Sequence, residues 1–393
     1  MSAALRRIVT PTAVVRLVLG WGAVLALPVF GPLLEPPAPA PLLITALIVI
    51  VGVILTCAFG VVHEAEHLAR RLGDPYGSLV LTLSIVLIEV ILIAAVLLGP
   101  GEHATIARDS VMAVSMIILG AVVGLCLLIG GLRHGGMEAN RTGTSAYLSL
   151  MIVLGSLAFA LPAVIGVDGS YLPWQEIPII VLTIGIYAFF LTRQMGAQAD
   201  DFREVDPRLV GALTSGVSGS GVRARPPSVE VARPSIGETL STHRVEILLR
   251  LALLVVTVLP ILLLSHDMAA LLDDGLGRLG APVALSGIVI AMIVFLPETI
   301  TAIRAAWQGE VQRVSNLCHG ALVSTVGLTI PVVLVIGLLT GQQIVLAEGP
   351  ANLLLLGAAV LLSVTIFAAK RVTAVHGAAL LVVFAVYALS VFA

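Results

Sequence analysis

The feature that most constrains this chain is a series of apolar runs, each about as long as a membrane-crossing helix. A bilayer core about 30 Å thick needs roughly 20 apolar residues per helix, and runs of that length recur throughout the 393 residues. Lipid offers no partners to unpaired backbone groups, so these runs must be helical. The chain is therefore predicted to be an all-α polytopic membrane protein. The eleven predicted spans are 13–33, 42–62, 77–98, 110–132, 144–166, 177–195, 245–266, 281–305, 316–340, 350–369 and 372–392.

Composition supports this fold class and excludes others. Hydrophobic residues make up 59% of the chain and charged residues 11%, whereas a soluble domain carries about 25% charged residues. The formal net charge of −2 excludes a strongly basic nucleic-acid-binding protein. The partners expected from composition are the lipid bilayer and small inorganic cations, with no nucleic acid.

The basic residues predict the orientation. If the N-terminus is cytoplasmic, seventeen Lys and Arg residues lie in cytoplasmic loops, and only Arg108 and Arg278 lie in external ones. Cytoplasmic loops carry such an excess as a rule, so we expect a cytoplasmic N-terminus and an external C-terminus. Arg16 and Arg250 lie just inside cytoplasmic helix ends, where their long side chains are expected to reach water.

One connection, residues 196–243, is polar and contains a Gly-Ser run at 216–221. Such a segment cannot bury a hydrophobic core, so it is predicted to be a flexible cytoplasmic linker. It separates an earlier block of six predicted helices from a later block of five.

Two segments with the same pattern occur in these two blocks. Gly73-Asp74-Pro75 leads through an apolar helix to Glu89, and Gly280-Ala281-Pro282 leads through another to Glu298. These are the third and eighth predicted spans, which cross the membrane in opposite directions. Similar segments in oppositely oriented halves indicate an inverted repeat with the functional site between them.

Glu89 and Glu298 are the only acidic residues, of 23, that fall near the middle of a predicted span. An ionised carboxylate in the bilayer costs several kcal/mol unless it is paired, and no Lys or Arg is predicted deep in a helix. Either one divalent cation or two protons would neutralise the pair, and competition between them is the basis of antiport. The alternative is that the two acids are unrelated and serve packing.

Two carboxylates do not complete the shell of a calcium ion, which takes six to eight oxygens. Pro297 has no N–H and therefore frees a backbone carbonyl one turn before Glu298. Placement in neighbouring spans suggests further side-chain ligands. These candidates are Ser84, Ser115, Ser324, Thr325 and Asn316.

At these residues the chain resembles the calcium/cation antiporter superfamily, most closely the bacterial ChaA-type calcium/proton antiporters. The segment from Leu72 to Val90 is similar to the first signature region of the family, and Pro297-Glu298 with residues 311–320 is similar to the second. The sequence departs from broader family members at Ile85-Val86 and Val294-Phe295, where they carry Gly-Asn, and at Ser324, where many carry Gln.

The resemblance implies an extra N-terminal helix (1–40) and two inverted five-helix repeats (41–195 and 244–393) joined by the linker. It implies proton-driven export of Ca²⁺ across a bacterial inner membrane, with Na⁺ or K⁺ as further substrates and no resident cofactor. Glu89 and Glu298 would be the acids that bind metal and proton.

A rival signal is His63-Glu64-Ala65-Glu66-His67, which matches the H-E-x-x-H pattern of zinc metalloproteases. A catalytic zinc needs a third protein ligand, and none is evident in the sequence. We therefore favour an ion-attracting cytoplasmic entrance over a regulatory zinc site or an intramembrane protease, and expect a protein that is not an enzyme.

Two further alternatives stay open. His319 is a candidate proton relay because its ordinary pKa lies near neutrality, and an interior hydrogen-bonded histidine is the competing interpretation. A cation channel with an acidic site is the other functional alternative to a secondary antiporter.

Overall fold

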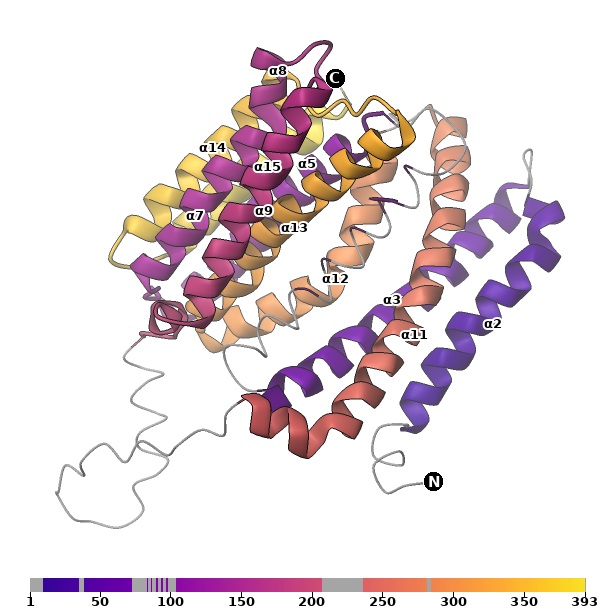
Figure 1. Ribbon diagram of the computed structural model, residues 1–393, viewed down its shortest axis with the longest axis horizontal. Helices are drawn as coiled ribbons and strands as arrows, with labels where there is room; N and C mark the ends of the chain where they lie inside the picture. The colour runs from indigo at the N-terminus through magenta and orange to yellow at the C-terminus, as the bar shows by residue number, and fades with distance from the viewer. Residues whose placement is uncertain are drawn as a thin grey trace.

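The computed structural model describes residues 10–34, 39–72, 104–206, 236–280 and 284–392, with isolated positions between 83 and 97. Nearly all of these residues are helical (Figure 1). The elements are α2 (Pro11–Leu34), α3 (Ala40–Leu72), α5 (Ile106–Met116), the π-helical η1 (Ile117–Val123), α6 (Gly124–His134), α7 (Arg141–Gly155), the π-helical η2 (Ser156–Ala160), α8 (Leu161–Ile165), α9 (Pro173–Met195), the 3₁₀ turn η3 (Ala199–Phe202), α11 (Ile236–Arg278), α12 (Ala284–Gln308), α13 (Val311–Thr340), α14 (Pro350–Ala368) and α15 (Ala374–Ser390).

The prediction of an all-α membrane protein is confirmed. Eight of the described helical segments are long and apolar enough to cross a bilayer, and α15 is a shorter apolar helix. Every predicted span has a matching described helix except 77–98, which lies mostly outside the described residues.

The helices pack as two bodies with separate hydrophobic cores. In the first, α3 packs against α11, and α2 packs against both (right side of Figure 1). The core of this body is built from α3 and α11 and includes Ile54, Val61 and Leu264. The second and larger body contains the described helices from α5 to α9 and from α12 to α15. Helix α12 belongs to this larger core through Phe295, while its Ile293 packs on the first core.

Within the larger body, helices from one half of the sequence pack against helices from the other half. Helix α9 of the first half packs on α13 of the second half, and α15 of the second half packs on α6 of the first. Connecting loops from the two halves also pair with each other. Met137 and Val372 pair through two backbone hydrogen bonds, and Leu346 N and Ala347 N both donate to Gly169 O. These reciprocal contacts fit an inverted repeat.

Two helices touch through their backbones at the α6–α15 contact. A Cβ atom on Gly377 would overlap the backbone nitrogen of Leu128 and the carbonyl oxygen of Gly124, and one on Gly131 would overlap the backbone of Ala374. Only glycine permits such an approach between membrane helices.

Helices α3 and α11 extend beyond the predicted spans 42–62 and 245–266. At about 1.5 Å per residue each is longer than a bilayer core is thick. Tilting in the bilayer accommodates such excess length. The predicted linker 196–243 is structured at both ends, through η3 and through the first turns of α11, and residues 207–235 lie outside the described residues.

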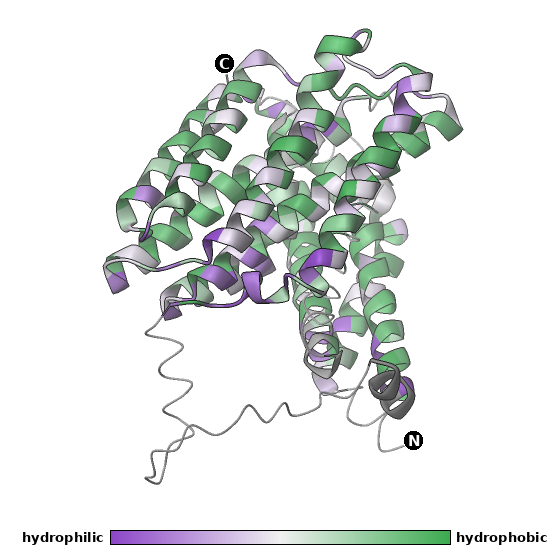
Figure 2. Cartoon of the chain, turned by 60° about the vertical axis from the view of Figure 1, so that its left-hand side comes forward, coloured by the Kyte–Doolittle hydropathy of each residue, from purple (hydrophilic) through white to green (hydrophobic). Residues whose placement is uncertain are grey.

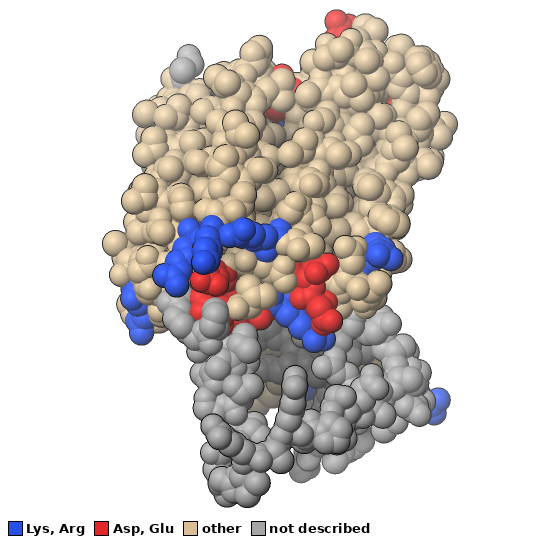
Figure 3. Space-filling model, turned by 90° about the vertical axis from the view of Figure 1, so that its left-hand side faces the viewer, with Lys and Arg blue, Asp and Glu red and all other residues tan. Residues whose placement is uncertain are grey.

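The two ends of the bundle differ in charge. We call the end at which α6 ends and α13 begins the inner end, and the opposite end, with loop 341–349, the outer end. On the face shown in Figure 3, most of the charged side chains gather at the inner end. Hydrophobic residues cover the shafts of the helices between the ends (Figure 2). The start of α2 and the end of α15 lie at opposite ends (Figure 1), as an odd number of crossings requires.

Candidate cation and proton site

Glu298 lies in the interior of α12, the helix that contacts both bodies. Its side chain is 7% exposed. Pro297 precedes it and cannot donate to the carbonyl of Ile293, so this carbonyl oxygen loses its helical donor. The helix resumes with Thr301 Oγ1 donating to Pro297 O at 3.0 Å. The sequence thus places a carboxylate and a freed carbonyl within about one turn of each other.

Helix α13 faces Glu298 with a strip of small and hydroxyl-bearing side chains. The carboxylate of Glu298 lies near enough to Cys318 for its charge to act on the thiol. Thr325 and Thr329 follow Cys318 at helical spacings of seven and eleven residues, so all three share one face. Both threonines are fully buried. The structure therefore brings the predicted ligand Thr325 onto the face that meets Glu298, and it adds Thr329.

Ser115 and Ser324 occupy matching places in the two halves. The sequence interval from Ser115 to Ser324 equals the interval from Glu89 to Glu298. Each hydroxyl donates to the carbonyl four residues earlier, Ser115 to Val111 at 2.6 Å and Ser324 to Gly320 at 2.8 Å. Ser324 also accepts a hydrogen bond from Tyr187 Oη at 2.9 Å. Both serines keep acceptor capacity for a further donor or a cation.

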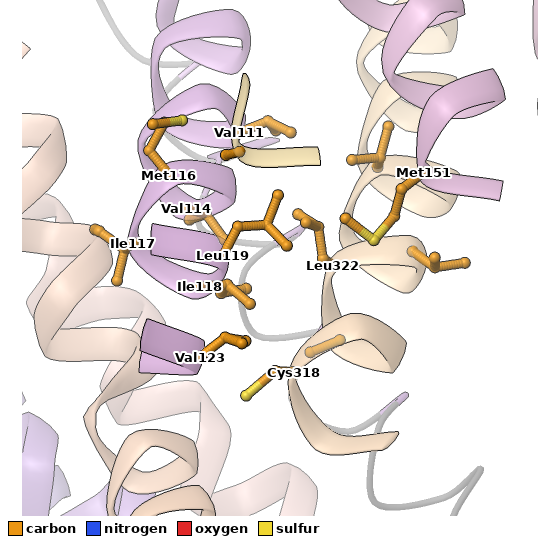
Figure 4. Packing of buried hydrophobic residues seen from close by; sticks show 14 of the residues in the cluster. Val111, Val114, Met116, Ile117, Ile118, Leu119, Val123, Met151, Cys318 and Leu322 are labelled. Atoms are coloured by element: carbon orange, nitrogen blue, oxygen red, sulfur yellow. The ribbon is translucent and has the colours of Figure 1, made fainter. Parts of the chain in front are cut away.

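A π-helical segment follows Ser115 in the middle of the larger body. Residues Ile117–Val123 form η1, which packs against α12, α13 and α15. Leu119 of η1 points toward Leu322 of α13 (Figure 4). Such π segments inside α-helices are frequent at functional sites. They change the direction of side chains on either side, here immediately after a predicted ligand.

Two of the predicted ligands cannot be placed. Glu89 and Ser84 lie outside the described residues. The described neighbours Val86, Val90 and Ile93 are buried in the interior of the protein.

Asn316 is engaged at the inner end rather than beside Glu298. Its side-chain amide donates to Phe202 O at 2.7 Å, and its oxygen accepts from Gln312 Nε2 at 2.9 Å. Gln312 Oε1 in turn accepts from Asn140 N at 2.8 Å. These bonds hold the segment after α9 and the start of α7 against α13.

Glu204 completes this inner polar cluster. Its carboxylate accepts from the backbone nitrogens of Val205, Asp206 and Gln312 at 3.0–3.3 Å. Burial raises the pKa of Glu204 above its ordinary value, and the three N–H donors oppose that rise. The start of the predicted linker is therefore bound to the N-terminus of α13.

His319 is fully buried on a different side of α13 from Cys318. Its Nδ1 lies 2.9 Å from Ser315 Oγ, which lies 3.2 Å from Thr144 Oγ1 of α7. Its ring contacts Phe367 of α14 edge-on. The histidine therefore belongs to a polar chain between α7 and α13, and an aromatic side chain of α14 packs against its ring.

The H-E-x-x-H segment lies toward the inner end of α3, and Glu64 within it is buried. Its Oε2 accepts from Arg250 Nη1 of α11 at 2.5 Å, and Arg250 Nε also donates to Glu246 at 3.4 Å. His63 is exposed, and its ring contacts that of His67. The expectation that Arg250 reaches water is wrong, because Glu64 offers it a partner inside the protein.

This pairing bears on the zinc interpretation. The carboxylate that would serve a protease as general base is bound to a guanidinium group. Within the described residues, no group of three or more His, Cys, Asp and Glu side chains is arranged to hold a metal ion. For Glu66 the structure describes the backbone only.

Comparison with known proteins decides the family. Residues 42–196 and 248–393 match the family described as sodium/calcium exchanger protein. The chain belongs to this family. It is 29% identical over 355 residues to the sodium-potassium/proton antiporter ChaA of Escherichia coli, with 88% of each chain covered.

Solved structures show that the exchanger also shares its fold with other transporters. YfkE matches with a TM-score of 0.62 at 17% identity, over 96% of this chain and 99% of the other. The H⁺/Ca²⁺ exchanger CAX matches with a TM-score of 0.63 at 15% identity, over 96% and 87%. The relatives are transporters, so the expectation that the exchanger is not an enzyme is confirmed.

Sequence reasoning missed several polar residues inside the exchanger. Tyr187 was not singled out, although Tyr-Ala recurs at Tyr187-Ala188 and Tyr387-Ala388 in the last helices of the two halves. That repetition could have revealed it. Glu176 lies near the start of α9, and the packing of this helix buries it.

Proposed function

We propose that this exchanger is a secondary active antiporter that exports Ca²⁺ from the cytoplasm in exchange for external protons, with Na⁺ or K⁺ as further substrates. Glu298 and Glu89 are the acids that bind the metal ion and the protons in turn. Thr325, Ser115 and Ser324 supply neutral oxygens. The inner end faces the cytoplasm of a bacterial cell, and the two five-helix repeats 41–195 and 244–393 follow the extra helix 1–40.

The observation that carries this proposal is that the buried Glu298 lies on α12, the helix that packs against both bodies. Its helix, α12, shares the core of the larger body and also contacts α3 and α11. A carboxylate inside a membrane protein requires a cation or a proton to neutralise it. If the bodies move relative to each other, a site on α12 faces one membrane side at a time, as alternating access requires.

The smaller body is suited to move as a unit. Helices α3 and α11 share one core and are joined by the Glu64–Arg250 ion pair. A motion that keeps this buried pair intact costs far less than one that separates the two charges. The mirrored helices α3 and α11 would therefore change position together.

The test is transport in everted membrane vesicles, in which added cation collapses a preformed proton gradient. E298Q keeps the size of the side chain and removes its charge, so we expect no response to Ca²⁺, Na⁺ or K⁺ at wild-type expression. E89Q should behave in the same way. Wild-type transport in E298Q would refute the assignment.

E310Q is the matched control. Glu310 makes a surface ion pair with Arg313 at 3.1 Å, and such pairs contribute little. This variant should transport at the wild-type rate. A cation current that persists without a proton gradient in the wild-type protein would instead support a channel.

A further inference from the structure

Helices α6 and α12 meet at the inner end through a close contact that fixes the position of a tryptophan. A Cβ atom on Gly130 of α6 would lie 3.1 Å from the carbonyl oxygen of Ala306. His134 Nε2 donates to Trp307 O at 3.1 Å, and the His134 ring packs on Gly309, directly after the end of α12. These contacts hold the last turn of α12, and Trp307 with it, against the last turn of α6.

The guanidinium group of Arg133 lies over the indole ring of Trp307. Its Cζ is 4.1 Å from the ring centroid, which is within the range of a cation–π interaction. Arg304 precedes Trp307 by three residues on α12, and residues three apart on a helix are neighbours on its surface. All three side chains are exposed. We call Arg133, Arg304 and Trp307 the basic platform.

The protein supplies no anion to the basic platform. Within the described part of the chain, neither of its arginines forms an ion pair. The acidic residues of the two adjoining loops are engaged elsewhere, Glu138 with Arg371 at 3.3 Å and Glu310 with Arg313 at 3.1 Å. A cation–π contact uses the flat face of a guanidinium group, so its in-plane N–H donors are left for another acceptor.

The basic platform lies where the apolar surface of the bundle ends. Leu132, directly before Arg133, is 74% exposed, and the apolar span that contains both residues ends at His134. Met292, four turns before Trp307 on the same side of α12, is 45% exposed. Lipid chains cover such residues in a spanning helix, and Trp and Arg beside them lie at the level of the headgroups.

We propose that the basic platform binds the headgroup phosphate of an anionic phospholipid. The guanidinium groups of Arg133 and Arg304 donate to the phosphate oxygens, and the acyl chains lie along Leu132 and Met292. The bound lipid would join the inner ends of α6 and α12. This inference goes beyond the proposed function and does not depend on which ion is transported.

The chemistry of the platform favours this ligand over two related ones. Arginine matches phosphate geometry with paired N–H donors. A zwitterionic lipid carries the same phosphate together with a cation, which two arginines without acidic partners would repel. Free phosphate has the same oxygens but no chains to cover the exposed apolar side chains of α6 and α12. A lipid with a net negative charge satisfies both parts of the surface.

The first test measures lipid binding directly. Native mass spectrometry of the full-length protein, titrated with phosphatidylglycerol or phosphatidylcholine, counts the lipids that remain bound. The wild-type protein should bind phosphatidylglycerol more tightly, and the preference should shrink as salt rises. In the double variant R133Q/R304Q the affinity for phosphatidylglycerol should fall at least about tenfold, because two basic side chains no longer attract the lipid. The affinity for phosphatidylcholine should stay unchanged.

The second test separates a built site from general surface charge. R133K keeps the positive charge but loses the planar group that stacks on Trp307 and pairs with phosphate, so its affinity should lie between those of the wild-type protein and the double variant. R193Q is the matched control. Arg193 is exposed in the last turn of α9, also at the inner end, and its Nε donates to Gln198 Oε1 at 3.2 Å. Its loss should leave the tightest phosphatidylglycerol bound.

Three results would overturn the proposal. The first is wild-type affinity for phosphatidylglycerol in R133Q/R304Q, and the second is an equal loss of affinity in R193Q. The third is displacement of the lipid by equimolar inorganic phosphate, which would show a site for soluble anions. If the double variant does not fold, R133K and the salt series of the wild-type protein decide the question. None of these readouts involves transport, so a failure of the proposed antiport would leave this inference standing.

Discussion

The buried ion pair between Glu64 and Arg250 gives the sharpest prediction about stability. Removing one partner of a buried pair typically costs 3–5 kcal/mol, because the other charge is left uncompensated. In E64Q the guanidinium of Arg250 keeps a contact with Glu246 at 3.4 Å, and Glu246 is partly exposed. We therefore expect the lower end of this range, a loss of about 3 kcal/mol in the free energy of unfolding. In R250M, Glu64 loses its guanidinium, so the loss should be at least as large.

The assay is reversible unfolding in mixed micelles, applied as a double-mutant cycle. The E64Q/R250M protein contains no unpaired charge at this position, so it should be more stable than the sum of the single losses predicts, by about 2 kcal/mol. E310Q, at the surface pair with Arg313, should cost less than about 1 kcal/mol. Additive single losses, or an E64Q protein as stable as E310Q, would refute the reasoning.

Two further predictions concern packing and pH. G377A should lower the free energy of unfolding by about 2 kcal/mol or more, because the added methyl group overlaps the backbone of α6. The control G357A places its methyl group in open space and should leave the free energy of unfolding unchanged in the same assay. Burial raises the pKa of Glu348 above its ordinary value of 4.5, against opposing effects of Asn352 and Arg108. The folded state then holds the proton more tightly than the unfolded state, so the free energy of unfolding should rise as pH falls through the raised pKa and level off below pH 4.5. The measurement is the difference in the free energy of unfolding between the wild-type protein and E348Q as a function of pH. A difference that does not depend on pH would contradict the prediction.

Much of the fold follows from the sequence because lipid imposes one strong rule. Each apolar run must form a helix, and the basic residues then predict the direction of the first one. The ends of α3 and α11 were not predictable in this way. Helix α3 continues past its apolar run through Glu64, which pairs with Arg250 of α11, and no hydropathy limit marks the point at which either helix ends.

The candidate site was predictable only where chemistry forced it. Glu298 stands out in the sequence because a carboxylate inside a span is expensive. The contacts of Asn316 could not be predicted from the sequence, because its partners Phe202 and Gln312 come from a distant loop and from its own helix. The pairing of Glu64 with Arg250 depends on how α3 meets α11, and local sequence carries no record of that contact.

The contact between α6 and α15 limits where transport can cause movement. Helices that touch through glycine backbones have no layer of adaptable side chains between them, so sliding by even a fraction of a turn would bring a bulky residue against the opposite chain. Their register is therefore fixed through the cycle. In the proposed transport cycle, the displacement that opens one membrane side and closes the other is therefore expected elsewhere, along the boundary where α3 and α11 lie against α12.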